Sequence, residues 1–291
     1  MDLVVGAMGF VGGLAARQLC ERGRSVRALV RGGAGRNEAR CLIEAGASVV
    51  DGDLTQPASV VRACEGIESV VCTVTSMPNA GGDALQRIDH DGALGLIREA
   101  ERAGARRFVY ISLSGNIRTD SPLTRAKRRC EAELASSRME FVVLRPSYFM
   151  EVWLGPHLGF DAANACARIY GNGQARVSYI SGEDVAAFVT AAATMPGPLR
   201  DTVEIGGPEP VSQLEAVALF EGTTGRRFSV EHVPLAALEA QYQSPDPLQQ
   251  TFAALSISYA LGDAVLEAKE SASRYGVSLR SLAGFAAGFP Q

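Results

Sequence analysis

The sequence lacks the features that mark several large classes of protein. It has no surplus of positive charge, because 28 Lys and Arg residues stand against 32 Asp and Glu residues, whereas surfaces that attract nucleic acid or anionic membrane are usually basic. Its six cysteines include no Cys-x-x-Cys pair, and no histidine stands at metal-ligand spacing, so we expect reduced thiols and no metal site. No apolar run approaches the roughly 20 residues of a membrane span, and no basic leader opens the chain. These absences favour a cytoplasmic protein with small-molecule partners, without nucleic acid or membrane.

Short apolar runs alternate along the chain with longer stretches of helical period. With 47% apolar residues over 291 positions, the chain has material for a sizeable core. The pattern predicts strands at 3–5, 26–30, 49–50, 69–74, 108–112 and 141–144, and helices at 11–22, 38–45, 58–64, 84–103 and 124–136. This rhythm is typical of an α/β fold with a doubly wound parallel sheet of the Rossmann type. Because the rhythm loosens later, we expect a Rossmann domain over 1–150 and, over 151–291, a mixed segment that completes the sheet and forms a smaller substrate-binding cap.

A glycine-rich turn joins the first predicted strand to the first predicted helix. Gly6, Gly9 and Gly12 are spaced as in a dinucleotide-binding turn, and Met8, Phe10 and Val11 complete the segment. Glycine is needed where the backbone turns tightly against phosphate oxygens, and the helix N-terminus supplies free N–H groups. The alternative is a glycine turn packed for its own sake. The strand, helix and second strand around it favour the pyrophosphate of a nicotinamide dinucleotide.

The end of the second strand bears on the type of dinucleotide. An NAD-binding unit usually carries a carboxylate there for the ribose 2′-hydroxyl, whereas this chain has Arg31, and every charged residue from 24 to 36 is arginine. We therefore expect NADP(H) to be preferred over NAD(H), although Arg31 as a solvated surface residue is the alternative. After the third strand, Asp53 is a candidate acceptor for the adenine amine, or a carboxylate near the start of the next helix.

The motifs VVGAMGFVGG, RALVR, GDLTQP, AERAGARRFVYIS, AKRRCEAEL, FVVLRPSYFMEVWL, SGEDVA and VEIGGPE run over nearly the whole chain. In these motifs the sequence resembles the extended and atypical short-chain dehydrogenase/reductases, most closely the NmrA-like branch, which includes NADPH-dependent quinone, triphenylmethane-dye and benzylic ether reductases. The resemblance implies further cofactor contacts at Leu54, Thr73, Val74, Thr75, Lys127, Pro146 and Ser147.

The short-chain reductases typically use a Tyr-x-x-x-Lys pair, and this chain departs from it. Lys127 occupies the lysine position, but Leu123 stands where the tyrosine acid would be. The resemblance implies that Lys127 holds the nicotinamide ribose and is the first catalytic candidate. The alternative places Lys127 on a basic helix face with Glu131 as its i+4 salt-bridge partner. Loss of the tyrosine counts against epimerase or dehydratase chemistry, which needs an acid/base at a substrate hydroxyl.

The remaining site candidates follow the fifth and sixth strands. Ser112 and Ser114 lie at the carboxyl edge of the sheet, where ligands of open α/β sheets bind, so Ser112 is a catalytic candidate and Ser114 a pocket candidate; strand-end capping is the alternative. After Pro146, the expected pocket wall is aromatic and adaptable, suited to a flat apolar substrate, with core packing as the alternative. Its members are Tyr148, Phe149, Met150 and Trp153, and Tyr148 is also a candidate replacement for the missing acid.

Other conspicuous polar residues receive structural roles. We interpret His90, His157 and His232 as surface or structural, and Asp89 and Asp91 as facing solvent or a neighbouring helix. The segment Ser181-Gly182-Glu183-Asp184 predicts a helix N-cap rather than a catalytic cluster.

The leading prediction is an NADPH-dependent oxidoreductase that transfers hydride to a small aromatic or conjugated substrate such as a quinone or enone. The alternative of a different class is a non-catalytic NADP(H)-sensing regulator or assembly factor, which would have a protein partner. An epimerase-like or dehydratase-like enzyme is the weaker alternative. A homodimer is compatible with either class.

Overall fold

A computed structural model describes residues 1–77, 81 and 83–289. The chain forms two compact units. The first comprises residues 1–112, 125–144 and 186–203, and the second comprises residues 113–124, 145–185 and 204–291. The chain therefore passes repeatedly between the units, and a single boundary at residue 150 stays a prediction.

The first unit is built on a parallel sheet of seven strands in the order β10-β6-β5-β4-β1-β2-β3. Val4 of β1 pairs with Ala28 of β2 on one side and with Val71 of β4 on the other, so the strand order reverses at β1. This topology confirms the predicted doubly wound Rossmann sheet. The strands are β1 (Asp2–Val5), β2 (Val26–Val30), β3 (Ser48–Asp51), β4 (Ser69–Cys72), β5 (Arg107–Ile111), β6 (Glu140–Pro146) and β10 (Arg200–Ile205).

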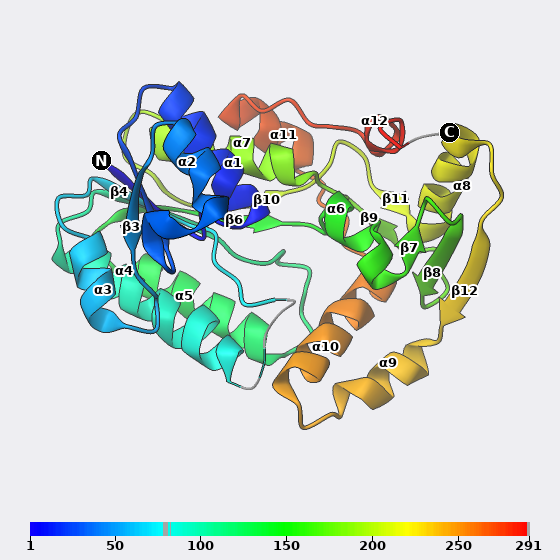
Figure 1. The fold of residues 1–291 in the computed structure, drawn as a ribbon. Helices are drawn as coiled ribbons and strands as arrows, with labels where there is room; N and C mark the ends of the chain where they lie inside the picture. Colours follow the sequence, from blue (N-terminus) through cyan, green and yellow to red (C-terminus); the bar gives the residue numbers. More distant parts are fainter. Residues whose placement is uncertain (78–80, 82, 290–291) are drawn as a thin grey trace. The chain divides into compact units, whose positions relative to one another are not determined.

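Helices cover both faces of this sheet (Figure 1). The helices α1, α2 and α7 lie on one face and α3, α4 and α5 on the other, so the central strands are buried on both sides and read as continuous apolar runs. Thr190 of α7 donates a hydrogen bond to Gln18 of α1 across the first layer. The helical segments are α1 (Phe10–Glu21), η1 (Gly33–Gly35), η2 (Asn37–Ala39), α2 (Arg40–Glu44), α3 (Pro57–Ala63), η3 (Leu85–Gly92), α4 (Ala93–Arg102), α5 (Pro122–Ser136) and α7 (Gly182–Thr194).

The predicted helix at 84–103 is two segments with different windings. Residues Leu85–Gly92 form a π-helix, η3, which continues into the α-helix α4. The wider winding of a π-helix changes which side chains face inward, so a period of 3.6 residues no longer predicts burial there.

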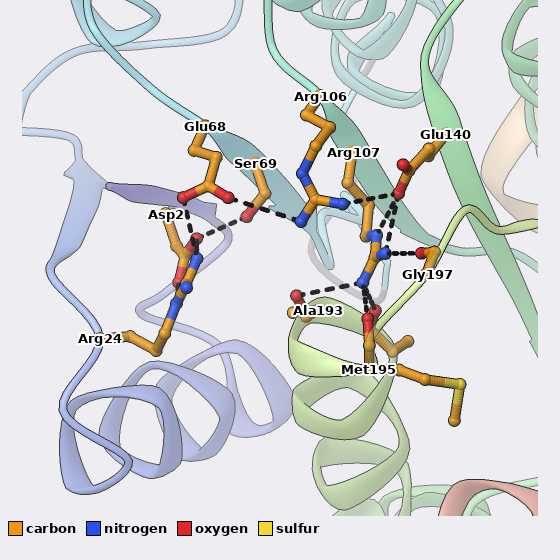
Figure 2. Close-up of polar contacts among 11 residues, drawn as sticks. Asp2, Arg24, Glu68, Ser69, Arg106, Arg107, Glu140, Ala193, Met195 and Gly197 are labelled. Atoms are coloured by element: carbon orange, nitrogen blue, oxygen red, sulfur yellow. Dashed lines mark hydrogen bonds and ion pairs between the residues drawn. The ribbon is translucent and has the colours of Figure 1, made fainter.

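An ion-pair network closes the amino-terminal edge of the sheet, away from the glycine turn (Figure 2). The guanidinium of Arg107 is fully buried and donates to Glu140 on β6 and to the carbonyls of Ala192 and Met195 at the end of α7. Cationic donors stabilise the unpaired carbonyls at a helix C-terminus. Because this network occupies the amino-terminal edge, we expect a ligand site at the carboxyl edge of the sheet, where open α/β sheets bind ligands.

The second unit carries two small sheets, β11-β9 and β12-β8-β7, and five further helices of at least five residues. Its elements are α6 (Met150–Trp153), η4 (Pro156–Leu158), β7 (Phe160–Asp161), β8 (Cys166–Tyr170), β9 (Arg176–Val177), β11 (Val211–Ser212), α8 (Gln213–Thr224), β12 (Ser229–Val233), α9 (Leu235–Tyr242), α10 (Pro247–Leu261), α11 (Ala268–Tyr275) and α12 (Leu282–Ala286). Within the described part of the chain, no helix combines the length and apolarity needed to cross a membrane.

Candidate functional site

The glycine turn between β1 and α1 has no room for side chains at two of its glycines. Gly6 has a φ of +92°, and a Cβ placed on it would lie 2.5 Å from Thr73 Oγ1. A Cβ on Gly12 would lie 2.2 Å from the carbonyl oxygen of Gly6. Both positions therefore require glycine because the backbone of the turn, the first turn of α1 and the end of β4 approach one another closely.

The start of α1 fits an anionic group. Gly9 is the N-cap residue, no side chain caps the helix, and the first turn contains no acidic residue. The unpaired N–H groups of such a helix start, together with its dipole, favour a phosphate. The exposed side chains of Met8 and Phe10 flank the turn, and Val11 is partly exposed. These residues fit the pyrophosphate of a dinucleotide, which the candidate site would hold by backbone contacts.

Two charged residues come from the ends of the adjacent strands β2 and β3. Arg31 follows β2 directly and is exposed. The carboxylate of Asp51, the last residue of β3, accepts a hydrogen bond from the N–H of Gly32 at 2.8 Å. The sequence pattern did not predict this carboxylate, because Asp51 is brought next to Gly32 only by the pairing of β2 with β3. A ribose phosphate at this edge would therefore meet one cation and one anion.

Asp53 is held in place by the loop that follows it. Its Oδ1 accepts hydrogen bonds from the N–H and the hydroxyl of Thr55, both at 2.8 Å, while its own N–H donates to Ser59. Leu54 is nearly buried and packs in the core of the first unit. The second oxygen of Asp53 is not used in these contacts, so the predicted adenine contact stays a prediction.

Lys127 turns inward from α5 and is only 4% exposed. Its ammonium donates to the carbonyl of Val74 at 2.9 Å and to that of Ile111 at 3.2 Å. It also lies 3.9 Å from Asp89 Oδ1 and 5.0 Å from the centre of the Tyr110 ring. The alternative of a surface lysine paired with Glu131 is wrong, because the side chain is buried and faces the ends of β4 and β5.

The loop after β4 connects Lys127 to the glycine turn. A Cβ on Gly6 would lie 3.2 Å from the Val74 nitrogen, and the carbonyl oxygen of the same Val74 accepts the hydrogen bond from Lys127. Thr73 and Val74 are partly exposed, and Thr75 is exposed. The predicted cofactor residues Gly6, Thr73, Val74 and Lys127 are therefore neighbours in one unit.

Ser112 is engaged by charged side chains of α5. Its hydroxyl donates to Glu131 Oε1 at 2.5 Å, and Arg128 donates to both Ser112 Oγ and Glu131. Ser112 is 2% exposed. In this arrangement the hydroxyl is already occupied, and its catalytic role stays a prediction.

The aromatic candidates of the second unit pack against one another. Tyr148 and Trp153 have ring centroids 4.7 Å apart, and Tyr259 lies 4.9 Å from the first and 4.4 Å from the second. Met150 is also buried, whereas Phe149 is partly exposed. This packing agrees with the alternative interpretation, in which these side chains form a core. For the rings to line a substrate pocket, they would have to move apart.

The geometry disfavours Tyr148 as a proton donor. Its hydroxyl donates to the carbonyl of Leu255 at 3.0 Å. Burial, and then the negative charge of Asp263, raise the pKa of this phenol well above its ordinary value. Neither Tyr148 nor the buried Leu123 offers the acid that the tyrosine supplies in the resembling reductases.

The other site candidates of the second unit are buried, and the two serines among them donate hydrogen bonds to Asp263. Ser114 donates to Asp263 Oδ1 at 2.7 Å, and Ser147 donates to the carbonyl of Asp263 at 3.3 Å. Pro146 is buried at the end of β6. Their predicted contacts with substrate or cofactor stay predictions.

Most of the polar residues interpreted as structural lie on the surface or make structural contacts. Ser181 Oγ accepts a hydrogen bond from the N–H of Asp184, which confirms the N-cap of α7. His157 and His232 are exposed, and His90 contacts its neighbour Asp91. Asp89 is 1% exposed and faces Lys127 of the neighbouring helix α5, which agrees with the second of the two orientations expected for it. Among the residues described, no three His, Cys, Asp or Glu side chains are grouped as a metal site would require.

Comparison with known proteins identifies the class. Residues 6–196 match a family model described as NAD(P)H-binding, which is more than half of the chain. The chain belongs to this NAD(P)H-binding family. The match confirms a nicotinamide dinucleotide as the cofactor type and is consistent with the resemblance to the NmrA-like short-chain dehydrogenase/reductases.

Individual relatives differ in what they do. The chain is 30% identical over 258 residues, or 87% of its length and 84% of the relative's, to a (4-alkanoyl-5-oxo-2,5-dihydrofuran-3-yl)methyl phosphate reductase of Streptomyces griseus. It is 28% identical over 237 residues, or 81% of its length and 71% of the relative's, to the photosystem II assembly factor Ycf39 of Synechocystis. Among solved structures, the fold is shared with an NADPH-dependent quinone oxidoreductase of Escherichia coli, with a TM-score of 0.79, 20% identity and 98% coverage of both chains.

Proposed function

We propose that the protein is an NADPH-dependent reductase that transfers hydride to a small conjugated or aromatic acceptor. The observation that carries the proposal is the inward position of Lys127, whose ammonium donates to the carbonyl of Val74, a residue that lies beside Gly6 of the glycine turn. The Streptomyces relative supports the substrate class, because its name describes the reduction of an unsaturated lactone.

Different residues of the first unit would bind different parts of the cofactor. The glycine turn and the start of α1 would hold the pyrophosphate, and Arg31 would face the 2′-phosphate. Lys127 would hold the hydroxyls of the nicotinamide ribose, which sets the position of the ring. When bound, NADPH supplies the hydride, so the protein contributes position and exclusion of water. A conjugated acceptor stabilises the charge that it gains, which suits a site where Leu123 replaces the usual acid.

The test follows loss of reduced-nicotinamide absorbance with quinones, enones and cationic dyes as acceptors. We expect Lys127→Ala to lower turnover by at least about 100-fold while NADPH still binds. The matched control is Lys269→Ala, because Lys269 is exposed on α11. Gly12→Ala should abolish NADPH binding, since its Cβ would lie 2.2 Å from a backbone oxygen. Equal turnover in Lys127→Ala and wild type would contradict the proposed role of Lys127.

A nucleotide-sensing regulator is the second candidate, favoured by the similarity to the Synechocystis assembly factor. Such a protein would bind NADP(H) through the same turn and report its redox state to a protein partner. Tight NADPH binding by the wild type with no turnover on any acceptor would favour this candidate over the reductase.

A further inference from the structure

Lysine is scarce in this chain and one of its two copies is buried. Of the 28 cationic side chains, only Lys127 and Lys269 are lysines. Lys269 is exposed, whereas Lys127 is 4% exposed. Arginine stays protonated in proteins, while a lysine ammonium is able to lose its proton when it is desolvated. The groups that surround the buried Lys127 ammonium are therefore of interest.

The carboxylate that faces Lys127 belongs to Asp89 of η3. Its Oδ1 lies 3.9 Å from Lys127 Nζ and has no hydrogen-bond partner among the described residues. Its Oδ2 accepts hydrogen bonds from the N–H of Ser76 at 2.9 Å and from the Ser76 hydroxyl at 2.5 Å. One buried carboxylate thus contacts both the ammonium and the loop that follows β4.

The other titratable groups near Lys127 are neutral at physiological pH. Burial raises the pKa of the Cys72 thiol on β4 to about 11. Burial likewise raises the pKa of the Cys130 thiol on α5, and raises that of the Tyr110 phenol on β5 well above its ordinary value. The negative charge that opposes the Lys127 ammonium therefore comes from Asp89.

We propose that Asp89 is a positioning residue that keeps the Lys127 ammonium charged and fixes it against the loop at residues 74–76. An opposite charge within about 4–6 Å favours the charged form of a buried group, and a buried ammonium without one is costly. Because Asp89 also binds Ser76, the same side chain sets the position of the Val74 carbonyl that accepts from Lys127. The role of this pair in catalysis rests on the proposed reductase function, whereas the interaction between Asp89 and Lys127 can be tested without it.

The first test observes Lys127 directly. In a Lys269→Arg background Lys127 is the only lysine, so lysine labelled with ¹³C and ¹⁵N gives one side-chain signal to follow by NMR as the pH is raised. We expect Asp89→Asn to move the pH at which this signal changes lower by about one unit or more, because the opposing charge is lost. The control is Asp91→Asn, on the same helix but exposed, which should leave the signal as in the parent protein. An unchanged titration in Asp89→Asn would overturn the proposal.

A second test covers the case in which Asp89→Asn folds poorly. The free energy of unfolding is measured for Asp89→Asn, Lys127→Met and the double variant. If the two residues form a charge pair, the double variant should lose less free energy of unfolding than the two single variants lose together. Each single variant leaves one buried charge without its partner, whereas the double variant leaves none. Additive losses would overturn the proposal.

The third test concerns turnover. We expect Asp89→Asn to lower kcat by about tenfold or more, because Lys127 positions the nicotinamide ring, with the KM for NADPH changed less than about threefold, because the glycine turn still holds the pyrophosphate. Rescue by Asp89→Glu would support the role of the charge. A wild type that reduces no acceptor would contradict the reductase function, whereas the NMR titration and the stability cycle would still decide the Asp89 proposal.

Discussion

Asp51 accepts a hydrogen bond from the N–H of Gly32 at 2.8 Å, one residue beyond Arg31 at the end of β2. The carboxylate and the guanidinium are both exposed and come from adjacent strands. A 2′-phosphate bound at this edge would be attracted by Arg31 and repelled by Asp51. We therefore expect the two side chains to act in opposite directions on the choice between NADPH and NADH.

Replacing Arg31 by Ala should weaken NADPH binding much more than NADH binding. The change removes the cation that a 2′-phosphate would contact, and charge-assisted hydrogen bonds to phosphate are among the stronger polar contacts. We expect a loss of about 1.5–3 kcal/mol for NADPH and a much smaller loss for NADH, measured by titration calorimetry with both cofactors. Equal losses for the two cofactors would contradict the assignment of Arg31.

Replacing Asp51 by Asn should have the opposite effect. Asparagine keeps an oxygen for the Gly32 N–H but removes the negative charge, so NADPH should bind more tightly and NADH about as before. Because the group is exposed, salt screens the effect, and the gain should shrink as ionic strength rises. The same calorimetric titration at low and high salt measures it. A gain that is identical for NADH would show that Asp51 acts on the shape of the loop instead.

Local patterns in the sequence predicted the strands of the central sheet and the glycine turn, because each of these depends on residues close together along the chain. The partners of Asp89 and Asp51 were not predicted, for two different reasons. Asp89 was expected to face solvent or a neighbouring helix and faces Lys127 of α5, but helical period alone does not say which side chain on that helix it meets. Asp51 reaches Gly32 only because β2 and β3 are paired in the sheet. The parts of the candidate site that were not predicted therefore depend on contacts between residues far apart in the chain, which residue type alone does not indicate.

Arg107 should be important for stability, although it lies at the edge of the sheet opposite the site. Replacing it by Met leaves Glu140 without this partner and leaves the carbonyls of Ala192, Met195 and Gly197 without their donor. Breaking a buried charged network of this kind costs about 3–5 kcal/mol. Chemical denaturation measures the change. The control is Arg106→Met, because Arg106 also bonds to Glu140 but its side chain is 45% exposed, and its loss should cost at most about 1 kcal/mol.

The stability of the first unit should also depend on pH through Asp2. Burial alone would raise the pKa of this carboxyl, but hydrogen bonds from Arg24 and Ser69 and the charge of Arg24 outweigh it and lower the pKa below its ordinary value. A carboxyl whose pKa is lower in the folded state stabilises the protein above the pKa of the unfolded chain, near 3.9, and this contribution is lost as the pH falls through the folded value.

Asp2→Asn should therefore lower the free energy of unfolding at pH 7 by about 1–3 kcal/mol, and the difference from wild type should diminish toward pH 2, where the wild-type carboxyl is increasingly protonated. Denaturation at a series of pH values checks this. Asp83→Asn is the matched control, since Asp83 is exposed and pairs only with the exposed Arg87 among the contacts described. A difference between Asp2→Asn and wild type that is constant from pH 7 to pH 2 would show that the shape of the side chain, and not its charge, holds Arg24 and Ser69 together.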